Sequence, residues 1–171
     1  KSDIEFKNMK YEKPIFHLLN FESVNENKSP NLKAYKLGVK ILLDHYKCKG
    51  LIIIAWNAKH DAKILLNYFN NDNIYFIDAI QWAKILTKFH SYKQKEIMKK
   101  YDLGTQQHNS LSDTMDMIEC IKYIYTDYET RGKLSVEDLK IEVEIRKTDE
   151  IFERIIDDNM FKVFSIKDIS I

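Results

Sequence analysis

The stretch LIIIAWNAKHD (Leu51–Asp61) opens with four consecutive aliphatic residues and ends on a carboxylate. A continuous block of this kind, rich in β-branched side chains, is typical of a strand that is buried on both faces of a sheet. Apolar residues at helical spacing follow between residues 61 and 69, and a second β-prone block, IYFIDAI, spans residues 74–80. The centre of the chain therefore predicts a strand, a helix and a second buried strand, the unit from which parallel sheets are built.

The segments around this unit continue the alternation of strands and helices. Short β-prone segments cover residues 2–6 and 14–23, and Ser29 with Pro30 predicts the N-cap and the first position of a helix over 29–46. Apolar residues at helical spacing predict further helices over 82–89, 93–101 and 113–125. Strands joined by helices of this length predict an α/β fold whose sheet has a substantial parallel part.

The last part of the chain, residues 128–171, differs in composition, with 11 acidic against 8 basic side chains. We expect it to be a short C-terminal extension that packs on the core of a domain spanning residues 1–127. Ser135 favours a helix N-cap, whereas the alternation in IEVEI (141–145) also fits a strand, so both interpretations stay open. A closing strand is predicted within residues 160–171.

Composition and charge narrow the classes of protein to which the chain can belong. Its 171 residues, 44% hydrophobic and 31% charged, are enough for one well-buried core and are too apolar for a disordered chain. The net charge of +1 leaves no strong basic footprint, and no apolar run approaches the roughly 18 residues that cross a membrane, so we expect no membrane partner. The chain opens without an initiator Met, so we expect it to be part of a larger polypeptide or complex.

The two cysteines, Cys48 and Cys120, are far apart and belong to no CxxC pair. This spacing argues against a disulfide framework or a zinc knuckle. We expect both to be buried thiols in a protein of a reducing, intracellular compartment.

Carboxylates stand at the predicted strand ends, where α/β sheets bind their ligands. Asp61 follows the central strand, and Asp3 and Glu5 alternate on one face of the first strand. Asp113 and His108 flank the start of a late helix. If the four carboxylates converge without Lys or Arg partners, they need hard divalent cations to offset their repulsion, and two Mg²⁺ or Mn²⁺ ions roughly 4 Å apart would activate water for phosphodiester cleavage.

The ordered segments SDIEF, WNAKHDAKIL, IDAIQWAKIL and HNSLSD resemble the DEDDh 3′–5′ exonucleases of the DnaQ-like, RNase H-fold superfamily. The resemblance covers about residues 1–126. Its three motifs are an Asp-x-Glu on the first strand, an Asn-x-x-x-Asp after a central strand, and a His-x-x-x-x-Asp on a late helix. The residues that match these motifs in this chain are Asp3 with Glu5, Asn57 with Asp61, and His108 with Asp113.

The resemblance implies a fold, an activity and a set of site residues. It implies an RNase H-like mixed sheet with flanking helices, and a hydrolase that shortens the 3′ end of single-stranded DNA or RNA and releases nucleoside monophosphates. His108 would be the general base. Phe6, Trp56 and Asn57 are candidates for contact with the substrate, and of these only Asn57 comes from the motif. The residues implied as ligands of two Mg²⁺ or Mn²⁺ ions are Asp3, Glu5, Asp61 and Asp113.

Two of these assignments have alternatives. In PIFHLLNFES the better apolar run leads into Asn20 and Glu22, and that placement of the first motif would make the chain a catalytically inactive exonuclease-like module that binds nucleic acid or protein. Trp56 either packs at the end of the sheet or stacks on a base. Asp78 and Asp116 are interpreted as structural residues, and His60 as a solvent-facing residue at a helix start.

Overall fold

The computed structural model of the chain describes residues 44, 51–66, 74–106, 110–157 and 163–165. The strands expected at 2–6 and 14–23 lie outside the described residues. Of the helix expected over 29–46 only Asp44 is described, and it is helical.

The sheet has three strands among the described residues, in the spatial order β1-β2-β3. Strands β1 (Leu51–Ala55) and β2 (Ile74–Asp78) run parallel, with the register Leu51↔Ile74 to Ala55↔Asp78. Strand β3 (Val163–Ser165) pairs with β2 in the antiparallel sense. The chain is therefore a mixed α/β protein, mostly helical, and the strand expected within residues 160–171 is confirmed.

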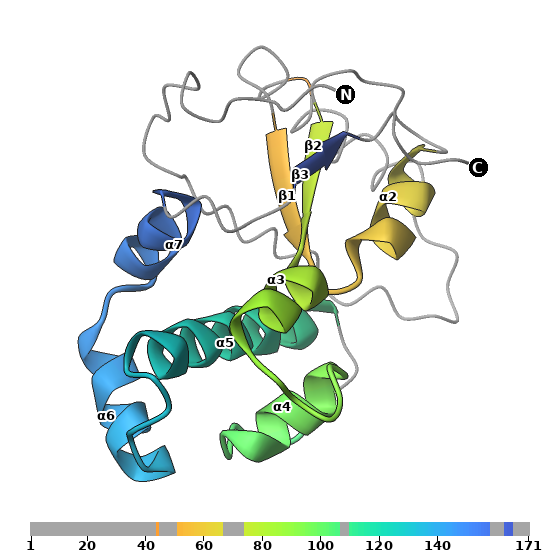
Figure 1. Ribbon diagram of the computed structural model, residues 1–171. Helices are drawn as coiled ribbons and strands as arrows, with labels where there is room; N and C mark the ends of the chain where they lie inside the picture. The colour runs from red at the N-terminus through yellow and green to blue at the C-terminus, as the bar shows by residue number, and fades with distance from the viewer. Residues whose placement is uncertain (1–43, 45–50, 67–73, 107–109, 158–162, 166–171) are drawn as a thin grey trace.

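Helices make up most of the described chain. They are α2 (Ala58–Leu66), α3 (Ala79–Leu86), α4 (Gln94–Lys100), α5 (Ser110–Glu129), α6 (Val136–Ile145) and α7 (Thr148–Asp157). In Figure 1, α5 runs below the carboxyl ends of β1 and β2, with α3 and α4 in front of it and with α6 and α7 at its far end. None of the helices formed by the described residues is both long and apolar enough to cross a membrane.

The strand–helix–strand unit forms as its sequence predicts, with two shifts at its boundaries. Helix α2 begins at Ala58, before Asp61, and its Ala58 and Ala62 are fully buried, because small side chains one turn apart let the helix approach the sheet closely. Strand β2 ends at Asp78, since the carboxylate of Asp78 accepts a hydrogen bond from the Ile80 backbone amide (3.0 Å) and thereby caps α3. The shift at each boundary is thus set by a local helix start.

Burial on both faces holds for β2 and only in part for β1. Ile74, Phe76 and Ile77 are buried in β2, the middle strand of the described sheet. Residues 52–55 of β1, an outer strand among the three that are described, are partly buried. The all-apolar sequence of β1 alone does not reveal this difference.

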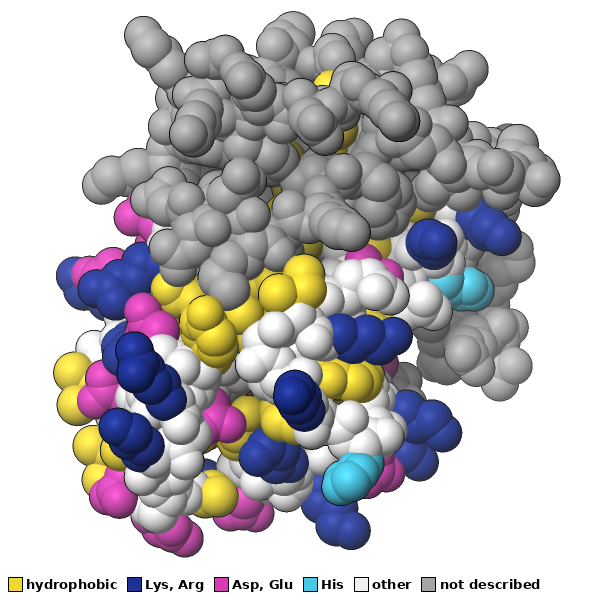
Figure 2. All heavy atoms as spheres, viewed as in Figure 1, with side chains coloured by type: hydrophobic (Ala, Val, Ile, Leu, Met, Phe, Trp, Pro, Cys, Tyr) yellow, Lys and Arg dark blue, Asp and Glu magenta, His cyan; other side chains and the backbone are white. Residues whose placement is uncertain are grey.

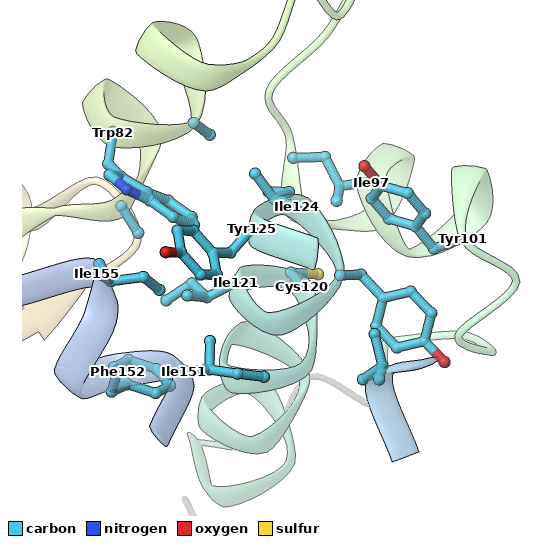
Figure 3. Packing of buried hydrophobic residues seen from close by; sticks show 14 of the residues in the cluster. Trp82, Ile97, Tyr101, Cys120, Ile121, Ile124, Tyr125, Ile151, Phe152 and Ile155 are labelled. Atoms are coloured by element: carbon cyan, nitrogen blue, oxygen red, sulfur yellow. The ribbon is translucent and has the colours of Figure 1, made fainter. Parts of the chain in front are cut away.

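The hydrophobic core is centred on α5. In Figure 3, the side chains of Ile121, Ile124 and Tyr125 lie between Trp82 of α3 on one side and Ile97 and Tyr101 of α4 on the other. Helix α7 closes the core with Ile151, Phe152 and Ile155, all 3% exposed or less. Each large apolar side chain buried in this way contributes about 1.5–3 kcal/mol to folding, so α5 holds the described helices together.

The C-terminal helices share this core. Ser135 caps α6 by accepting a hydrogen bond from the Asp138 amide (3.1 Å), so the helical interpretation of this segment is confirmed and the strand interpretation of IEVEI is wrong. Its alternating apolar residues point in two directions: Val143 is buried, whereas Ile141 and Ile145 are exposed. Helix α5 crosses the boundary expected at residue 127, and residues on both sides of it belong to one hydrophobic cluster.

Candidate functional site

The turn after β1 places Asp61 at the carboxyl end of the sheet. Asn57 has a φ of 65°, a left-handed conformation that Asn tolerates better than most residues, and its carbonyl accepts a hydrogen bond from the His60 amide (2.9 Å). The chain reverses there into α2, and Asp61 falls in the first turn of this helix, as predicted. His60 is exposed, which confirms its assignment as a solvent-facing residue.

Asp61 is a partly buried carboxylate that forms no ion pair among the described residues. Burial raises the pKa of Asp61 above its usual value of 3.8; the charge of Asp78 acts in the same direction, while His60 opposes it. Asp78 itself is 8% exposed and is used as the N-cap of α3, which confirms its structural interpretation. The end of the parallel pair therefore concentrates negative charge.

A second pair of carboxylates lies at the start of α5. Asp113 is in the first turn of the helix, and Asp116 follows three residues later, so both project from the same side of it. One carboxylate oxygen of each, Asp113 Oδ1 and Asp116 Oδ2, is buried without a hydrogen-bond partner among the described residues. Burial raises the pKa of Asp116, and the neighbouring charge of Asp113 raises it further.

One short segment connects the two pairs of carboxylates. The indole nitrogen of Trp56, the residue after β1, donates a hydrogen bond to the Tyr92 carbonyl (3.0 Å), and the Gln94 side-chain amide donates one to the Asp113 carbonyl (2.9 Å). Residues 92 and 94 thus fasten the end of β1 to the start of α5. Figure 1 shows the same arrangement, with the first part of α5 beneath the strand ends.

The structure describes four of the eight residues expected to take part in metal binding, catalysis or substrate contact. Asp61 and Asp113 are brought to the same end of the sheet. Trp56 is partly buried, packs against the hydrophobic cluster and uses its N–H in the bond to Tyr92, while the Asn57 side chain is exposed. Packing is therefore shown for Trp56, and base contact by Trp56 or Asn57 stays a prediction.

Four predicted site residues lie outside the described residues: Asp3, Glu5, Phe6 and His108. The same is true of Asn20 and Glu22, the alternative first motif. Within the described ranges, no group of three or more His, Cys, Asp or Glu side chains is close enough to hold a metal ion. The complete ligand set therefore stays a prediction.

Asp113 has one property that is expected of a metal ligand. A buried carboxylate oxygen without a donor costs about 1–3 kcal/mol, and a hard cation coordinates such an oxygen. The chemistry of Asp61 and Asp113, two carboxylates without a Lys or Arg partner in the described part of the chain, suits Mg²⁺ or Mn²⁺ better than a softer metal. The donor set, as far as it is described, fits the expected ions.

From the sequence, Asp116 is interpreted only as a structural residue. The structure places its carboxylate beside that of Asp113, with an equally unpaired oxygen. The signal for this was present in the sequence as the spacing of three residues, which puts two side chains on one face of a helix.

The described cysteine is inert. Cys120 is fully buried in the core, and burial together with the charges of Asp116 and Glu119 raises the pKa of its thiol to about 12. A thiol with this pKa is protonated at neutral pH and is a poor nucleophile. The prediction of a buried thiol is confirmed for Cys120, and Cys48 lies outside the described residues.

The class of protein that these features define is a mixed α/β protein with carboxylates at the carboxyl end of a parallel strand pair. No family model, no curated protein and no solved structure matches this chain. Its resemblance to the DEDDh exonucleases therefore depends on the sequence motifs.

Proposed function

We propose that the chain is a metal-dependent 3′–5′ exonuclease with an RNase H-like fold, which hydrolyses phosphodiester bonds at the 3′ end of single-stranded DNA or RNA. The observation that carries the proposal is the pair Asp61 and Asp113. Both lie at the same end of the sheet, and neither forms an ion pair in the described part of the chain. The ordered motifs around them supply the rest of the argument.

The residues divide the chemistry between them. Asp3, Glu5, Asp61 and Asp113 would hold two Mg²⁺ or Mn²⁺ ions, which when bound would neutralise phosphate charge and lower the pKa of a water molecule. His108 would take the proton of the attacking water, a role that suits histidine because the usual pKa of an imidazole is close to neutral pH. The four carboxylates would fix the positions of the ions, which would help to orient the scissile phosphate toward this water.

A nuclease assay tests the proposal. Wild-type protein is incubated with 5′-labelled single-stranded DNA and RNA oligonucleotides of matched sequence, with Mg²⁺, with Mn²⁺ and with EDTA. The expected result is stepwise shortening from the 3′ end with either metal and none with EDTA. His108→Ala should slow the reaction by roughly 10² to 10⁴. An unchanged ladder with both metals and both substrates contradicts the proposal.

A noncatalytic module that binds nucleic acid or protein is the second candidate. The observation that favours it is the better apolar run before Asn20 and Glu22, since an Asn in place of the first Asp removes one charged metal ligand. Calorimetric titration distinguishes the two candidates. The exonuclease should take up two Mn²⁺ ions, whereas the module should take up at most one, weakly.

A further inference from the structure

Residues 84–100 form a strongly basic segment, which we call the basic connector. It joins the last turns of α3 to α4 and contains six lysines and one acidic residue, Glu96. Its lysines are Lys84, Lys88, Lys93, Lys95, Lys99 and Lys100, all of them exposed. None of the six forms an ion pair in the part of the chain that the structure describes. Figure 2 shows Lys and Arg side chains gathered over α3 and α4.

Aromatic rings hold part of this charge in place. The Lys84 ammonium lies 5.7 Å from the centre of the Tyr92 ring, and that of Lys100 lies 5.1 Å from the centre of the Phe89 ring. Phe89 and Tyr92 also pack on each other, with centroids 5.8 Å apart. The rings are thus in contact with lysines and with one another, which favours a role in positioning charge over a role in stacking on bases.

Hydrogen bonds fix the backbone of the connector. The Tyr92 hydroxyl donates to the Thr87 carbonyl (2.8 Å) and accepts from the Phe89 amide (3.1 Å). The same connector is fastened to the candidate site through the bonds from Trp56 to the Tyr92 carbonyl and from Gln94 to the Asp113 carbonyl. Residues 92 and 94 of the connector therefore lie beside the candidate site, and α4 continues from there along α5 to Tyr101, which bonds Asp127.

Helices α6 and α7, which pack on α5, have the reverse charge. Residues 136–157, which include α6 and α7, carry eight acidic and four basic side chains. The cavity between these helices, lined by Glu142, Arg146, Glu150, Ile151 and Arg154, has its arginines in ion pairs with glutamates. A polyanion that reaches the candidate site is therefore attracted along α4 and repelled along α6 and α7.

We propose that the basic connector binds the phosphate backbone of a single-stranded nucleic acid whose 3′ end lies at the candidate carboxylates. The inference rests on the proposed exonuclease function, since that function supplies the strand. Contacts from exposed lysines to phosphates carry no sequence information, so binding is independent of base sequence and sensitive to salt.

Fluorescence anisotropy in EDTA, where no cleavage occurs, tests the inference. The probe is a 5′-fluorescein-labelled single-stranded DNA of about 12 nucleotides. The test variant is Lys95→Gln/Lys99→Gln, which removes two exposed charges one turn apart on α4 and keeps good helix formers. The matched control is Lys133→Gln/Lys147→Gln, which makes the same change in net charge on exposed residues outside the connector.

The two lysines of the test variant should each account for one phosphate contact. The slope of log K against log salt should then fall in magnitude by about 1.4, and affinity should fall roughly 25-fold at about 0.1 M salt. The control should bind as the wild type does, and oligothymidylate and oligoadenylate should bind alike. Equal binding by wild type and the test variant, or an equal loss in the control, overturns the inference. The inference is also overturned if a polyglutamate peptide of the same charge as the DNA displaces it, because the surface would then fit an acidic protein.

A cleavage assay on the same preparations separates this inference from the proposed function. Salt-dependent binding that the test variant loses, without metal-dependent cleavage, supports the connector and contradicts the exonuclease. Cleavage by wild type with no loss of binding in the test variant supports the exonuclease and overturns the connector.

Discussion

The two ends of α5 treat their carboxylates in opposite ways. At the C-terminal end, Asp127 accepts a hydrogen bond from the buried Tyr101 hydroxyl (2.8 Å), and Glu129 pairs with Arg146 and Arg154. At the N-terminal end, Asp113 and Asp116 each keep a buried oxygen without a partner among the described residues.

This difference separates carboxylates that stabilise the fold from carboxylates that cost it stability. A satisfied carboxylate at the C-terminal end holds α4, α6 and α7 against α5, whereas an unsatisfied one costs about 1–3 kcal/mol. Proteins leave buried polar groups without hydrogen-bond partners mainly at functional sites, where the cost in stability is offset by binding or catalysis. The N-terminal end of α5 is thus where a ligand would restore the missing interactions.

The largest effect that the comparison predicts concerns activity. Asp113→Ala should lower the rate of 3′ shortening by about 10³-fold or more, because the loss of a metal ligand removes several kcal/mol of transition-state stabilisation. Glu129→Gln, a change at the other end of the same helix, should leave the rate within about twofold of wild type. Initial rates on a 5′-labelled oligonucleotide with Mn²⁺ measure both. If Glu129→Gln lowered the rate as much as Asp113→Ala does, the distinction between the two ends of α5 would be contradicted.

A smaller effect concerns metal-linked stability. Binding of Mn²⁺ to the folded state should stabilise wild type by about 2.7 kcal/mol at a hundredfold excess over Kd. The shift in melting temperature should disappear in Asp113→Ala and persist in Asp127→Ala. Thermal unfolding followed by circular dichroism, with Mn²⁺ and with EDTA, measures it. Equal shifts in the two variants would mean that the ions bind elsewhere.

The third prediction applies one chemical change at both ends of the helix. Asp127→Ala should lower the free energy of unfolding by about 1–3 kcal/mol, since it leaves the buried Tyr101 hydroxyl without its acceptor. Asp116→Ala should raise it by about 1 kcal/mol in the absence of metal, because it removes an unsatisfied oxygen and introduces a better helix former. Urea titration in EDTA measures both.

Tyr101→Phe provides the control for this pair. If Asp127 acts through the Tyr101 hydroxyl, Asp127→Ala should cost less in the Tyr101→Phe background, because neither partner is then left unpaired. Identical costs in the two backgrounds would show that the hydrogen bond is not the cause. Destabilisation by Asp116→Ala would show that its carboxylate is satisfied in solution.

Much of the described fold follows from local sequence patterns. The apolar blocks at 51–56 and 74–80 predict the parallel strands, and apolar spacing predicts α3, α4 and α5, because a helix or strand buries one face at its own period. Boundaries are less predictable. Helix α5 extends from Ser110 to Glu129, beyond the predicted 113–125, since the residues added at its two ends are mostly polar.

The candidate site could be predicted only in part. Local sequence places Asp61 and Asp113 at helix starts, and the structure has both there. What brings the two helix starts together is a pair of long-range hydrogen bonds, from Trp56 to the Tyr92 carbonyl and from Gln94 to the Asp113 carbonyl. No periodicity encodes such contacts, because they join residues 36 and 19 positions apart.

The smallest predicted effect is a pH dependence with opposite signs at two aspartates. The folded-state pKa of Asp116 lies above 3.8, so its charge costs stability near neutral pH, and the cost disappears as pH falls through that pKa toward 3.8. The stability advantage of Asp116→Asn over wild type should therefore shrink between pH 7 and about pH 4.

Asp102 provides the comparison of opposite sign. The hydrogen bond and charge of Lys140 lower the pKa of Asp102, so the contribution of Asp102 to stability is full above pH 3.8 and is lost only below it. Asp102→Asn should then destabilise the protein to the same extent at both pH values, and urea midpoints at pH 7 and pH 4 compare the variants. A constant advantage of Asp116→Asn at both pH values would mean that its carboxylate is as well solvated in the folded chain as in the unfolded one.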